Sequence, residues 1–376
     1  MLRSTLITGG AGFIGCALAC RLVAAGDVVT ALDVLHPQVH AGRGRPGRLP
    51  DEVELVPGDV TVASTWDAVL KLVAPDRIVH LAAETGTGQS LTEASRHGRV
   101  NVVGTTEMLD AVLRADAVPA HIVLASSRAV YGEGLWESGG TTWSPGPRRR
   151  SDLEAGRWDP IGPGGAPAGP RASRADRTPA RPTSVYGATK LAQEHLLTAW
   201  CAATGSALSV LRLQNVYGPG QSLTNAYTGI VSLFGQLARR GEVLDVYEDG
   251  RITRDFVFIE DVADALVACL DRPPAADLTL DVGSGTATTI LDLATTLAGR
   301  FGAPTPKVSG KFRHGDVRAG YADITVTGQE LGYRPAWPLA RGLDALLEWM
   351  EHQPDAVAPG ARADATTATT WREVTP

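Results

Sequence analysis

The chain has 376 residues, of which 44% are apolar and 20% charged, as is usual for a globular protein with one large domain or two smaller ones. Its net charge of −6 argues against non-specific binding of nucleic acid. No run reaches the roughly 18 apolar residues of a membrane span, and residues 1–15 read as a strand and a turn rather than a signal peptide. We therefore expect a cytoplasmic protein that binds neither nucleic acid nor membranes.

The amino terminus has the pattern of a dinucleotide site. An apolar run at residues 6–8 precedes a glycine turn, and an apolar, helix-forming stretch continues from it to residue 25. Gly9 and Gly12 let the backbone turn tightly and approach a pyrophosphate, Gly15 lets the helix pack close to the strand, and the helix start supplies N–H donors. The residues that we assign to cofactor binding here are Gly9, Gly12, Phe13, Ile14 and Gly15.

A second predicted strand, residues 28–32, ends in Asp33, which lies 18 residues after Gly15. A carboxylate at this place can accept both ribose hydroxyls and repels a 2′-phosphate, which favours NAD over NADP. Arg43, Arg45 and Arg48 follow, and we interpret them as solvated loop charges.

Further strands are predicted at residues 53–56, 78–83 and 121–127, with a helix from Asn101 to about residue 113. Strands that alternate with helices at this spacing indicate an α/β fold with a doubly wound parallel sheet of the Rossmann type. A cofactor crosses the carboxyl ends of such strands. The additional cofactor-binding candidates at these ends are Asp59, Val60, Leu81, Ala82, Ala83, Asn101 and Ser126.

The four cysteines form no metal-binding pattern with nearby histidines, so we expect no metal site. Cys16 and Cys20 lie one helical turn apart, and we expect both to be buried packing residues.

Tyr186 and Lys190 are four residues apart, which places both side chains on one face of a helix. Free tyrosine has a pKa near 10, too high for a base at neutral pH. A cation at about 4 Å, at an effective dielectric of about 20, favours the phenolate by roughly 4 kcal/mol. The pair therefore predicts a tyrosine general acid or base whose pKa Lys190 lowers.

Taken in order, the motifs at residues 8–15, 80–83, 126–132, 186–190, 215–220 and 254–257 resemble those of the extended short-chain dehydrogenase/reductase family, within its NAD-dependent nucleotide-sugar epimerases and dehydratases. The resemblance covers residues 2 to about 350 and implies a Rossmann domain that binds NAD. It also implies a smaller carboxyl-terminal α/β domain that holds a sugar nucleotide. By the same resemblance, Ser127, Tyr186 and Lys190 form the catalytic set, and Tyr186 and Lys190 also contact the cofactor.

The two positions after Ser127 distinguish the reactions of this family. The 4,6-dehydratases carry Asp-Glu there and the decarboxylases keep a Glu, whereas this chain has Arg128 and Ala129. Elimination then lacks its acid and base, which favours 4-epimerisation through a transient 4-keto sugar. A 4-ketoreductase remains the main alternative, a dehydratase or decarboxylase is less favoured, and a non-catalytic nucleotide-binding protein is the alternative of a different class.

Residues 35–40, 83–90, 127–131 and 214–223 are similar to the dTDP-L-rhamnose 4-epimerase-like branch of the family. The resemblance implies a dTDP- or UDP-linked hexose or deoxyhexose as substrate, with arginines that clamp the diphosphate. The substrate-binding candidates are Glu84, Thr85, Ser127, Arg128, Asn215, Tyr227, Arg254 and Arg313.

The division into domains follows from the same motifs. We expect the NAD-binding domain at residues 1–213, with residues 251–283 returning to it, and the sugar-nucleotide domain at 214–250 and 284–350. Residues 133–182 are a Gly-, Pro- and Arg-rich insertion that forms either an ordered lid over the sugar or a mobile loop. Its composition favours mobility, although Trp136, Trp143 and Trp158 argue against complete disorder. Residues 353–376 are expected to be a flexible tail. Helices near 104–114 and 186–203 are apolar enough to pair with a second copy, and the resemblance to family dimers implies a homodimer.

Overall fold

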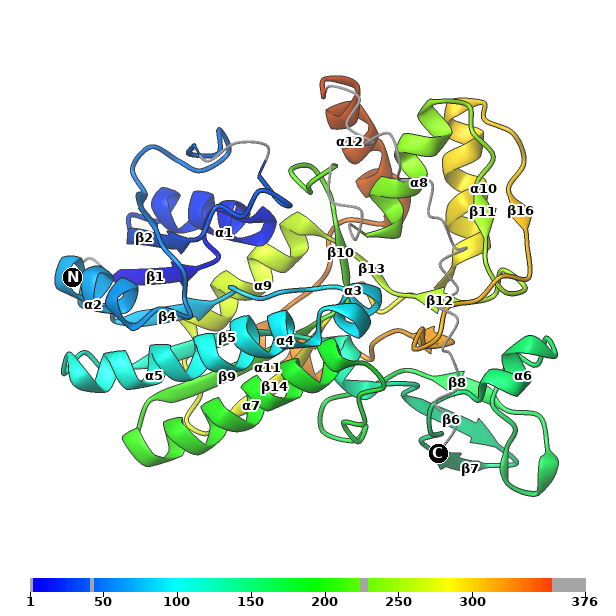
Figure 1. Ribbon diagram of the computed structural model, residues 1–376, viewed down its shortest axis with the longest axis horizontal. Coiled ribbons are helices and arrows are strands. Elements are labelled where there is room, and N and C mark those ends of the chain that lie inside the picture. The colour runs from blue at the N-terminus through cyan, green and yellow to red at the C-terminus, as the bar shows by residue number, and fades with distance from the viewer. Residues whose placement is uncertain (1–2, 41–43, 224–228, 354–376) are drawn as a thin grey trace, which may run out of the picture.

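The computed structural model describes residues 3–40, 44–223 and 229–353 (Figure 1). Seven parallel strands form its main sheet, in the order β14-β9-β5-β4-β1-β2-β3. The strands are β1 Ser4–Thr8, β2 Val28–Asp33, β3 Glu54–Pro57, β4 Arg77–His80, β5 His121–Ser127, β9 Ala207–Leu213 and β14 Leu278–Val282. This sheet confirms the predicted fold class, and the predicted strands match it within a few residues.

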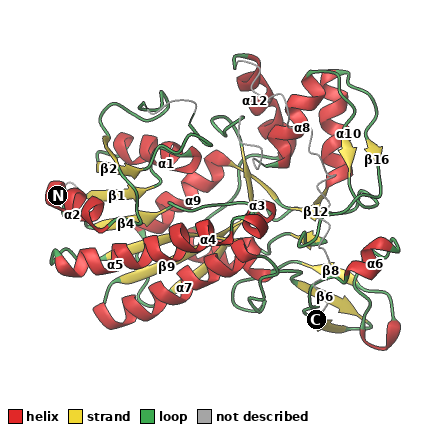
Figure 2. Cartoon of the chain, viewed as in Figure 1, coloured by secondary structure: helices red, strands yellow, loops and turns green. Residues whose placement is uncertain are grey.

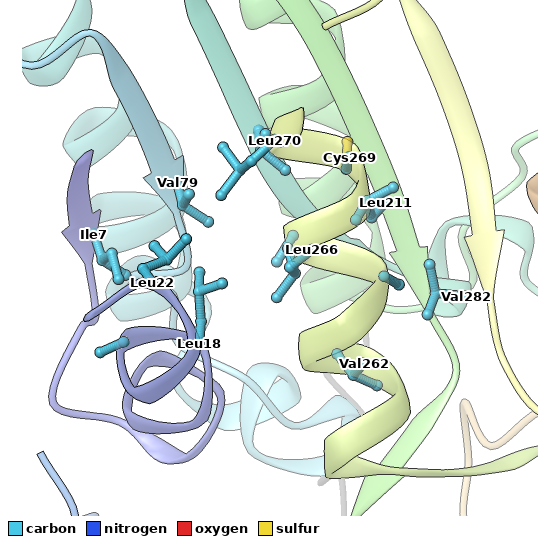
Figure 3. Close-up of a cluster of buried hydrophobic side chains, with 14 of the residues drawn as sticks. Ile7, Leu18, Leu22, Val79, Leu211, Val262, Leu266, Cys269, Leu270 and Val282 are labelled. Atoms are coloured by element: carbon cyan, nitrogen blue, oxygen red, sulfur yellow. The ribbon is translucent and has the colours of Figure 1, made fainter. Parts of the chain in front are cut away.

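Helices cover both faces of this sheet because the buried strands are apolar on both sides. Successive residues of a strand point to opposite faces. Ile7, Val79 and Leu211 therefore pack against α1 and α9 (Figure 3), whereas Leu6, Ile78 and Leu208 pack against α2, α5 and α7. These helices are α1 Phe13–Ala24, α9 Ile259–Asp271, α2 Ala63–Leu72, α5 Gly104–Arg114 and α7 Val185–Thr204. A π-helical stretch, Gly98–Val103, leads into α5, so the helix predicted from Asn101 begins earlier.

A second core lies beside the carboxyl ends of the strands. Its aromatic centre is formed by Tyr217, Phe256 and Phe258 on β10 Asn215–Tyr217 and β13 Phe256–Phe258. Three helices pack around it and stand together at the upper right of Figure 1. They are α8 Ile230–Arg239, α10 Ile290–Phe301 and α12 Leu339–Glu351.

Short elements complete the chain (Figure 2). The small strands are β11 Asp245–Val246, β12 Thr253–Arg254, β15 Thr288–Thr289, β16 Lys307–Val308 and β17 Ala319–Gly320. The small helices are α3 Thr87–Thr92, α4 Ala94–His97, α11 Thr325–Leu331 and the 3₁₀ helices Arg128–Tyr131 and Pro163–Gly165. None of the helices in the described ranges is long and apolar enough to cross a membrane.

The insertion at residues 133–182 is an ordered lobe, which agrees with the ordered alternative and not with the mobility that its composition favours. It contains a three-stranded antiparallel sheet, with β6 Leu135–Ser138 between β7 Thr141–Trp143 and β8 Gly169–Arg171, and the short helix α6 Arg150–Glu154. Trp136 is fully buried and stands opposite Trp143 in the sheet. The lobe lies at the lower right of Figure 1.

Buried ion pairs connect this lobe to Glu248 and Arg318, which lie outside the insertion. Glu248 forms an ion pair with Arg148 of the lobe at 2.8 Å and accepts a hydrogen bond from Arg318 at 3.0 Å. Arg318 also pairs with Asp159 of the lobe at 2.7 Å, and its backbone N–H donates to Glu133 at 2.8 Å. The composition of the insertion could not reveal these partners because they lie more than 80 residues away in sequence.

The cysteine prediction was half right. Cys16 is buried, but Cys20 is exposed on the outer side of α1. The proposed domain boundaries stay predictions, and the expected tail falls, apart from Gln353, outside the described residues.

Glu248 should be a main determinant of stability. Its carboxylate is fully buried between two arginines, and removing one partner of such a pair costs about 3–5 kcal/mol. We expect Glu248→Gln to lower the free energy of unfolding by about 3 kcal/mol, measured by chemical denaturation. The control is Glu154→Gln, which breaks the exposed Arg150–Glu154 pair and should change stability by less than about 1 kcal/mol. Equal effects of the two variants would contradict this view.

Candidate active site

In the glycine turn between β1 and α1, backbone segments lie so close together that only glycine fits between them. Gly9 has a φ of 66°, and a Cβ there would lie 2.9 Å from the backbone nitrogen of Ala82. A Cβ on Gly15 would lie 2.5 Å from the carbonyl oxygen of Gly9, so the helix can start this close only with glycine. No side chain caps the start of α1 at Gly12. The first-turn amides of α1 are therefore available to an anion.

Asp33 lies at the end of β2, next to this turn. Its carboxylate accepts from the backbone N–H of Ala11 at 3.1 Å and of Leu35 at 2.8 Å, and only 8% of it is exposed. His40 approaches it at 3.7 Å. These contacts orient the carboxylate toward the turn, as expected for a group that binds the cofactor ribose.

A cavity of about 350 Å³ opens over the turn, lined by Gly12, Phe13, Arg48 and Gly220 among others. The Arg48 guanidinium reaches from the β2–β3 connection to Gly220, because its Nε would lie 2.7 Å from a Cβ placed there. Arg48 is exposed, as we expected of a loop charge, but it also makes this contact with Gly220. Arg45 instead donates to the carbonyl oxygens of Pro50 and Val53. Arg43 lies outside the described residues.

The glycine cradle, the Asp33 carboxylate and the cavity together fit the adenosine and pyrophosphate parts of NAD. Other predicted cofactor residues surround this place. Phe13 and Ile14 begin α1. Leu81, Ala82 and Ala83 directly follow β4 and are partly buried.

Asp59 and Val60 follow β3 and shape the neighbouring turn. The Asp59 carboxylate accepts from the backbone N–H of Thr61 at 2.8 Å, while Val60 is buried. Asp59 therefore has a local structural partner in addition to the cofactor contact that we predict for it.

Asn101 links the segment after β4 to helix α7 through hydrogen bonds. Its Oδ1 accepts from the backbone N–H of Glu84 at 2.8 Å, and its Nδ2 donates to the Glu84 carbonyl at 3.0 Å and to Thr189 Oγ1 at 2.9 Å. The side chain is completely buried in the π-helical stretch. These contacts give Asn101 a structural part in the site, as a link between two segments.

The structure brings Ser127 and Tyr186 together. Ser184 caps α7, accepting from the Gly187 N–H at 3.1 Å, and so places Tyr186 in the first turn of that helix. A Cβ on Gly187 would lie 2.5 Å from the carbonyl oxygen of Ala129. Glycine at 187 therefore allows α7 to meet the segment that follows Ser127.

Burial raises the pKa of Tyr186, while a hydrogen bond with Ser127 and the positive charge of Arg128 lower it. The lowering of this pKa by Lys190 stays a prediction. Lys190 lies one turn further along α7 and donates to Gln193 Oε1 at 2.5 Å. Burial lowers the pKa of Lys190 to about 7, against the opposing effect of Glu194.

A buried polar network supports the lysine. Glu194 accepts from Ser126 Oγ at 2.5 Å and forms a two-pronged ion pair with Arg212 at 3.0 and 2.7 Å. Gln193 in turn donates to Thr105 at 2.8 Å. The Ser126 hydroxyl, predicted to serve the cofactor, thus donates to Glu194.

Three predicted substrate residues lie together. The Arg128 Nε donates to Asn215 Oδ1 at 2.8 Å, and Arg254 is buried nearby with one N–H donated to the Thr253 carbonyl at 2.7 Å. Burial, and next the charge of Arg254, lower the pKa of Arg128 to about 9. Partly buried Arg128 and buried Arg254 repel each other, which favours an anion between or beside them.

The remaining predicted substrate residues are placed differently. Arg313 is exposed and lies over the Tyr247 ring, 5.1 Å from its centroid. Glu84 pairs with Arg96 at 2.8 Å, and Thr85 is exposed beside it. Tyr227 falls outside the described residues.

Sequence reasoning missed His97 on α4. Its buried ring meets the Tyr186 ring edge-on, with centroids 6.4 Å apart, and its Nδ1 lies 3.0 Å from the Glu93 carbonyl. No sequence pattern indicated this contact or the reach of Arg48. Gln193, in contrast, could have been found, because it lies three residues after Lys190 on the same helical face.

Within the described ranges, no three or more His, Cys, Asp or Glu side chains gather in a way that could hold a metal ion.

Comparisons with known proteins agree on one family. Residues 5–283 match the "NAD dependent epimerase/dehydratase family". The chain is 56% identical to dTDP-L-rhamnose 4-epimerase of Burkholderia thailandensis, over 94% of this chain and 96% of that protein. It is 31% identical to UDP-glucose 4-epimerase of Mycolicibacterium smegmatis, over 93% and 99% of the two chains.

Solved structures give the same result. The crystal structure of UDP-glucose 4-epimerase from Thermotoga maritima with UDP-glucose matches with a TM-score of 0.75 and 25% identity, over 92% of this chain and 98% of that one. The structure of MoeE5 in complex with UDP-glucuronic acid and NAD matches with a TM-score of 0.71 and 28% identity, over 93% and 99%. The resemblance inferred from the motifs is thus confirmed: the chain belongs to the NAD-dependent epimerase/dehydratase family.

Proposed function

We propose that this protein is an NAD-dependent nucleotide-sugar 4-epimerase, and that a dTDP-linked 6-deoxyhexose, with dTDP-L-rhamnose first, is its substrate. The observation that carries the reaction type is the environment of the Ser127–Tyr186 pair. This pair faces Arg128, and no carboxylate occupies positions 128 or 129. The substrate follows from the similarity to dTDP-L-rhamnose 4-epimerase.

The nearest acid in sequence is unsuited to elimination. Glu133 is buried, and its carboxylate is engaged by Arg148 at 3.2 Å and by the backbone N–H of Arg318 at 2.8 Å. An acid held in this way cannot abstract a proton from the sugar without losing its own partners. This supports epimerisation over dehydration.

The residues would act as follows. Gly9, Gly12, Gly15 and Asp33 would hold NAD, which when bound supplies a reversible hydride acceptor at the sugar C4. Tyr186 would take the proton of the 4-hydroxyl, and Ser127 would hydrogen-bond the same oxygen through the transient ketone. On return, Tyr186 gives the proton back while the opposite face of the sugar is reduced.

Lys190 and the arginines would position the reactants. Lys190, anchored by Gln193, would bind the cofactor ribose. Arg128, Asn215 and Arg254 would bind the substrate beside the base, since a guanidinium can hold phosphate oxygens with two donors at once. We retain Arg313 as a diphosphate ligand and Glu84, Thr85 and Tyr227 as substrate contacts on the family resemblance.

We also propose that the protein is a homodimer and that it is cytoplasmic. A homodimer through α5 and α7 is supported by the exposed Val103 and Leu113 at the two ends of α5, and sedimentation velocity would test it. A cytoplasmic location is supported by four free cysteines in the described chain. We also propose the domain division at residue 213 given above.

The deciding experiment is incubation with a panel of dTDP- and UDP-hexoses without added cofactor, followed by NMR of the C4 configuration. We expect dTDP-L-rhamnose to equilibrate with its C4 epimer, using NAD that copurifies. Dependence on added reduced cofactor would instead establish a 4-ketoreductase, and a 4-keto-6-deoxy product from a hexose would establish a dehydratase.

Replacing Tyr186 by Phe removes the proton-transferring group and little volume. We expect kcat for epimerisation to fall by at least about 100-fold, because general acid–base catalysis contributes roughly that much or more. The NAD content of the purified variant serves as the control and should match that of the wild type. Unchanged turnover would show that Tyr186 is not the group that transfers the proton.

Replacing Arg48 by Ala should weaken cofactor retention. The guanidinium covers the cavity over the glycine turn, and a hydrogen bond to a charged group is worth about tenfold in affinity. We expect the purified variant to contain less NAD than the wild-type protein, measured as the NAD that is released on denaturation. Arg150→Ala, on the exposed helix α6, is the matched control and should retain wild-type NAD.

A further inference from the structure

We propose that Gln193 is a positioning residue, which fixes the Lys190 ammonium at the cofactor ribose through a directional chain of hydrogen bonds that ends at the glycine turn. The inference rests on the proposed function, in which Lys190 binds that ribose. It gives Gln193 a role in the retention of NAD that is exerted through Lys190.

The Lys190 ammonium has more donors than the protein uses. The side chain is buried, with only 2% of it exposed. An ammonium has three N–H donors, and the one hydrogen bond that it makes in the described part of the chain is to Gln193 Oε1, at 2.5 Å. Glu194, on the same helix, forms its ion pair with Arg212 instead. Two donors of Lys190 therefore remain for a ligand, as a lysine that binds ribose hydroxyls requires.

The orientation of the Gln193 amide is set by Thr105 on α5. The Thr105 hydroxyl has a single proton, which it donates to the Asn101 carbonyl at 2.6 Å. The same hydroxyl must therefore accept from Gln193 Nε2, which lies 2.8 Å away. With its amide nitrogen at Thr105, Gln193 turns its carbonyl oxygen toward Lys190. A rotation of the amide by 180° would place N–H donors against the ammonium and break both hydrogen bonds.

His80, at the end of β4, continues the chain from Thr105. Its Nε2 lies 3.0 Å from Thr105 Oγ1, and its Nδ1 lies 2.7 Å from Thr8 Oγ1. Because Thr105 has no second proton, Nε2 is the donor and Nδ1 accepts from Thr8. Burial, and next the charge of Lys190, lower the pKa of His80 to about 3, so the ring keeps a single proton at neutral pH. Each hydrogen bond of the chain thus has one possible direction.

Thr8 brings the chain to the predicted cofactor site. It is the last residue of β1 and directly precedes Gly9. Its hydroxyl also accepts from the backbone N–H of Ala82 at 3.2 Å. These residues lie at the carboxyl ends of parallel strands, where a dinucleotide crosses such a sheet. The chain therefore fixes the Lys190 ammonium relative to the turn that would hold the pyrophosphate.

The test is the rate at which bound NAD exchanges with isotopically labelled NAD in the purified protein. Gln193→Met keeps the length of the side chain but offers no oxygen to the ammonium. We expect it to speed the exchange about tenfold, because a hydrogen bond to a charged group contributes about that much to affinity. Gln193→Glu still offers an oxygen to Lys190 and should exchange NAD at close to the wild-type rate.

A double-mutant cycle with Lys190→Met separates positioning from general damage to the fold. K190M alone should speed the exchange at least as much as Q193M does. When Q193M is added to K190M, the rate should change by less than about twofold, because Gln193 then has no ammonium to hold. Multiplying effects of the two changes would overturn the proposal.

Ser209→Ala is the matched control for the loss of a buried hydrogen bond. The Ser209 hydroxyl lies 2.9 Å from His121 Nε2, near the amino ends of β9 and β5 and so at the end of the sheet opposite the glycine turn. S209A should exchange NAD at the wild-type rate. An equal increase in S209A, or a wild-type rate in a folded Q193M, would count against the proposal. Should Q193M not fold, Q193E decides: a rate close to that of the wild type supports the proposal, and a rate as high as that of K190M overturns it.

The proposed function can fail separately from this inference, since NAD exchange requires no substrate. A wild-type protein that holds NAD but epimerises no nucleotide sugar would refute the proposed function and leave the role of Gln193 standing. Epimerisation by the wild type together with an unchanged exchange rate in Q193M would refute the role of Gln193 alone.

Discussion

The site depends on the contact between the first turn of α7 and the segment after β5. Gly187 lies against the Ala129 carbonyl so closely that any side chain would force the two apart. That contact sets Tyr186 beside Ser127 and Arg128, which come from a region about 59 residues earlier in the chain. A shift of about 1 Å here would misplace the base relative to both partners, and such misplacement can cost about 100-fold in rate.

This arrangement carries a cost in desolvation, which the surrounding network offsets. Lys190 and Arg254 are buried in a medium that disfavours charge, and the cost is several kcal/mol for each ion without partners. The Glu194–Arg212 pair lies behind the lysine, and Glu194 favours its charged form. Near Arg254, by contrast, the acids are divided among competing arginines, so the positive charge of that region is only partly balanced.

The sequence predicted what depends on local pattern. Strand–glycine–helix order located β1, the turn and α1, and the four-residue spacing of Tyr186 and Lys190 correctly placed both on α7. Prediction from the sequence failed where the contacts of a residue lie far away in the chain. The insertion is ordered because Arg148 and Asp159 find Glu248 and Arg318, and no property of residues 133–182 alone encodes that.

The same limit explains the charge assignments. Coulomb's law applied to the one-turn separation of Tyr186 and Lys190 predicts an interaction between them, but helical spacing shows which residues share a face and not where a long flexible side chain ends. The Lys190 ammonium donates to Gln193. The contact between Arg48 and Gly220 likewise could not be foreseen, because Gly220 is remote in sequence.

The residue at position 128 affects both which reaction can occur and how readily Tyr186 acts as a base. A carboxylate at this position would supply an acid for elimination, but it would also put a negative charge beside Tyr186 and disfavour the phenolate. An arginine has the opposite effect on both counts, since it cannot protonate a leaving hydroxyl at neutral pH and it favours the phenolate. Under the proposed function, one side chain would thus stop the chemistry at the ketone and help the proton transfers on either side of it. The residue that argues against dehydration in this chain would then also support reversible oxidation at C4.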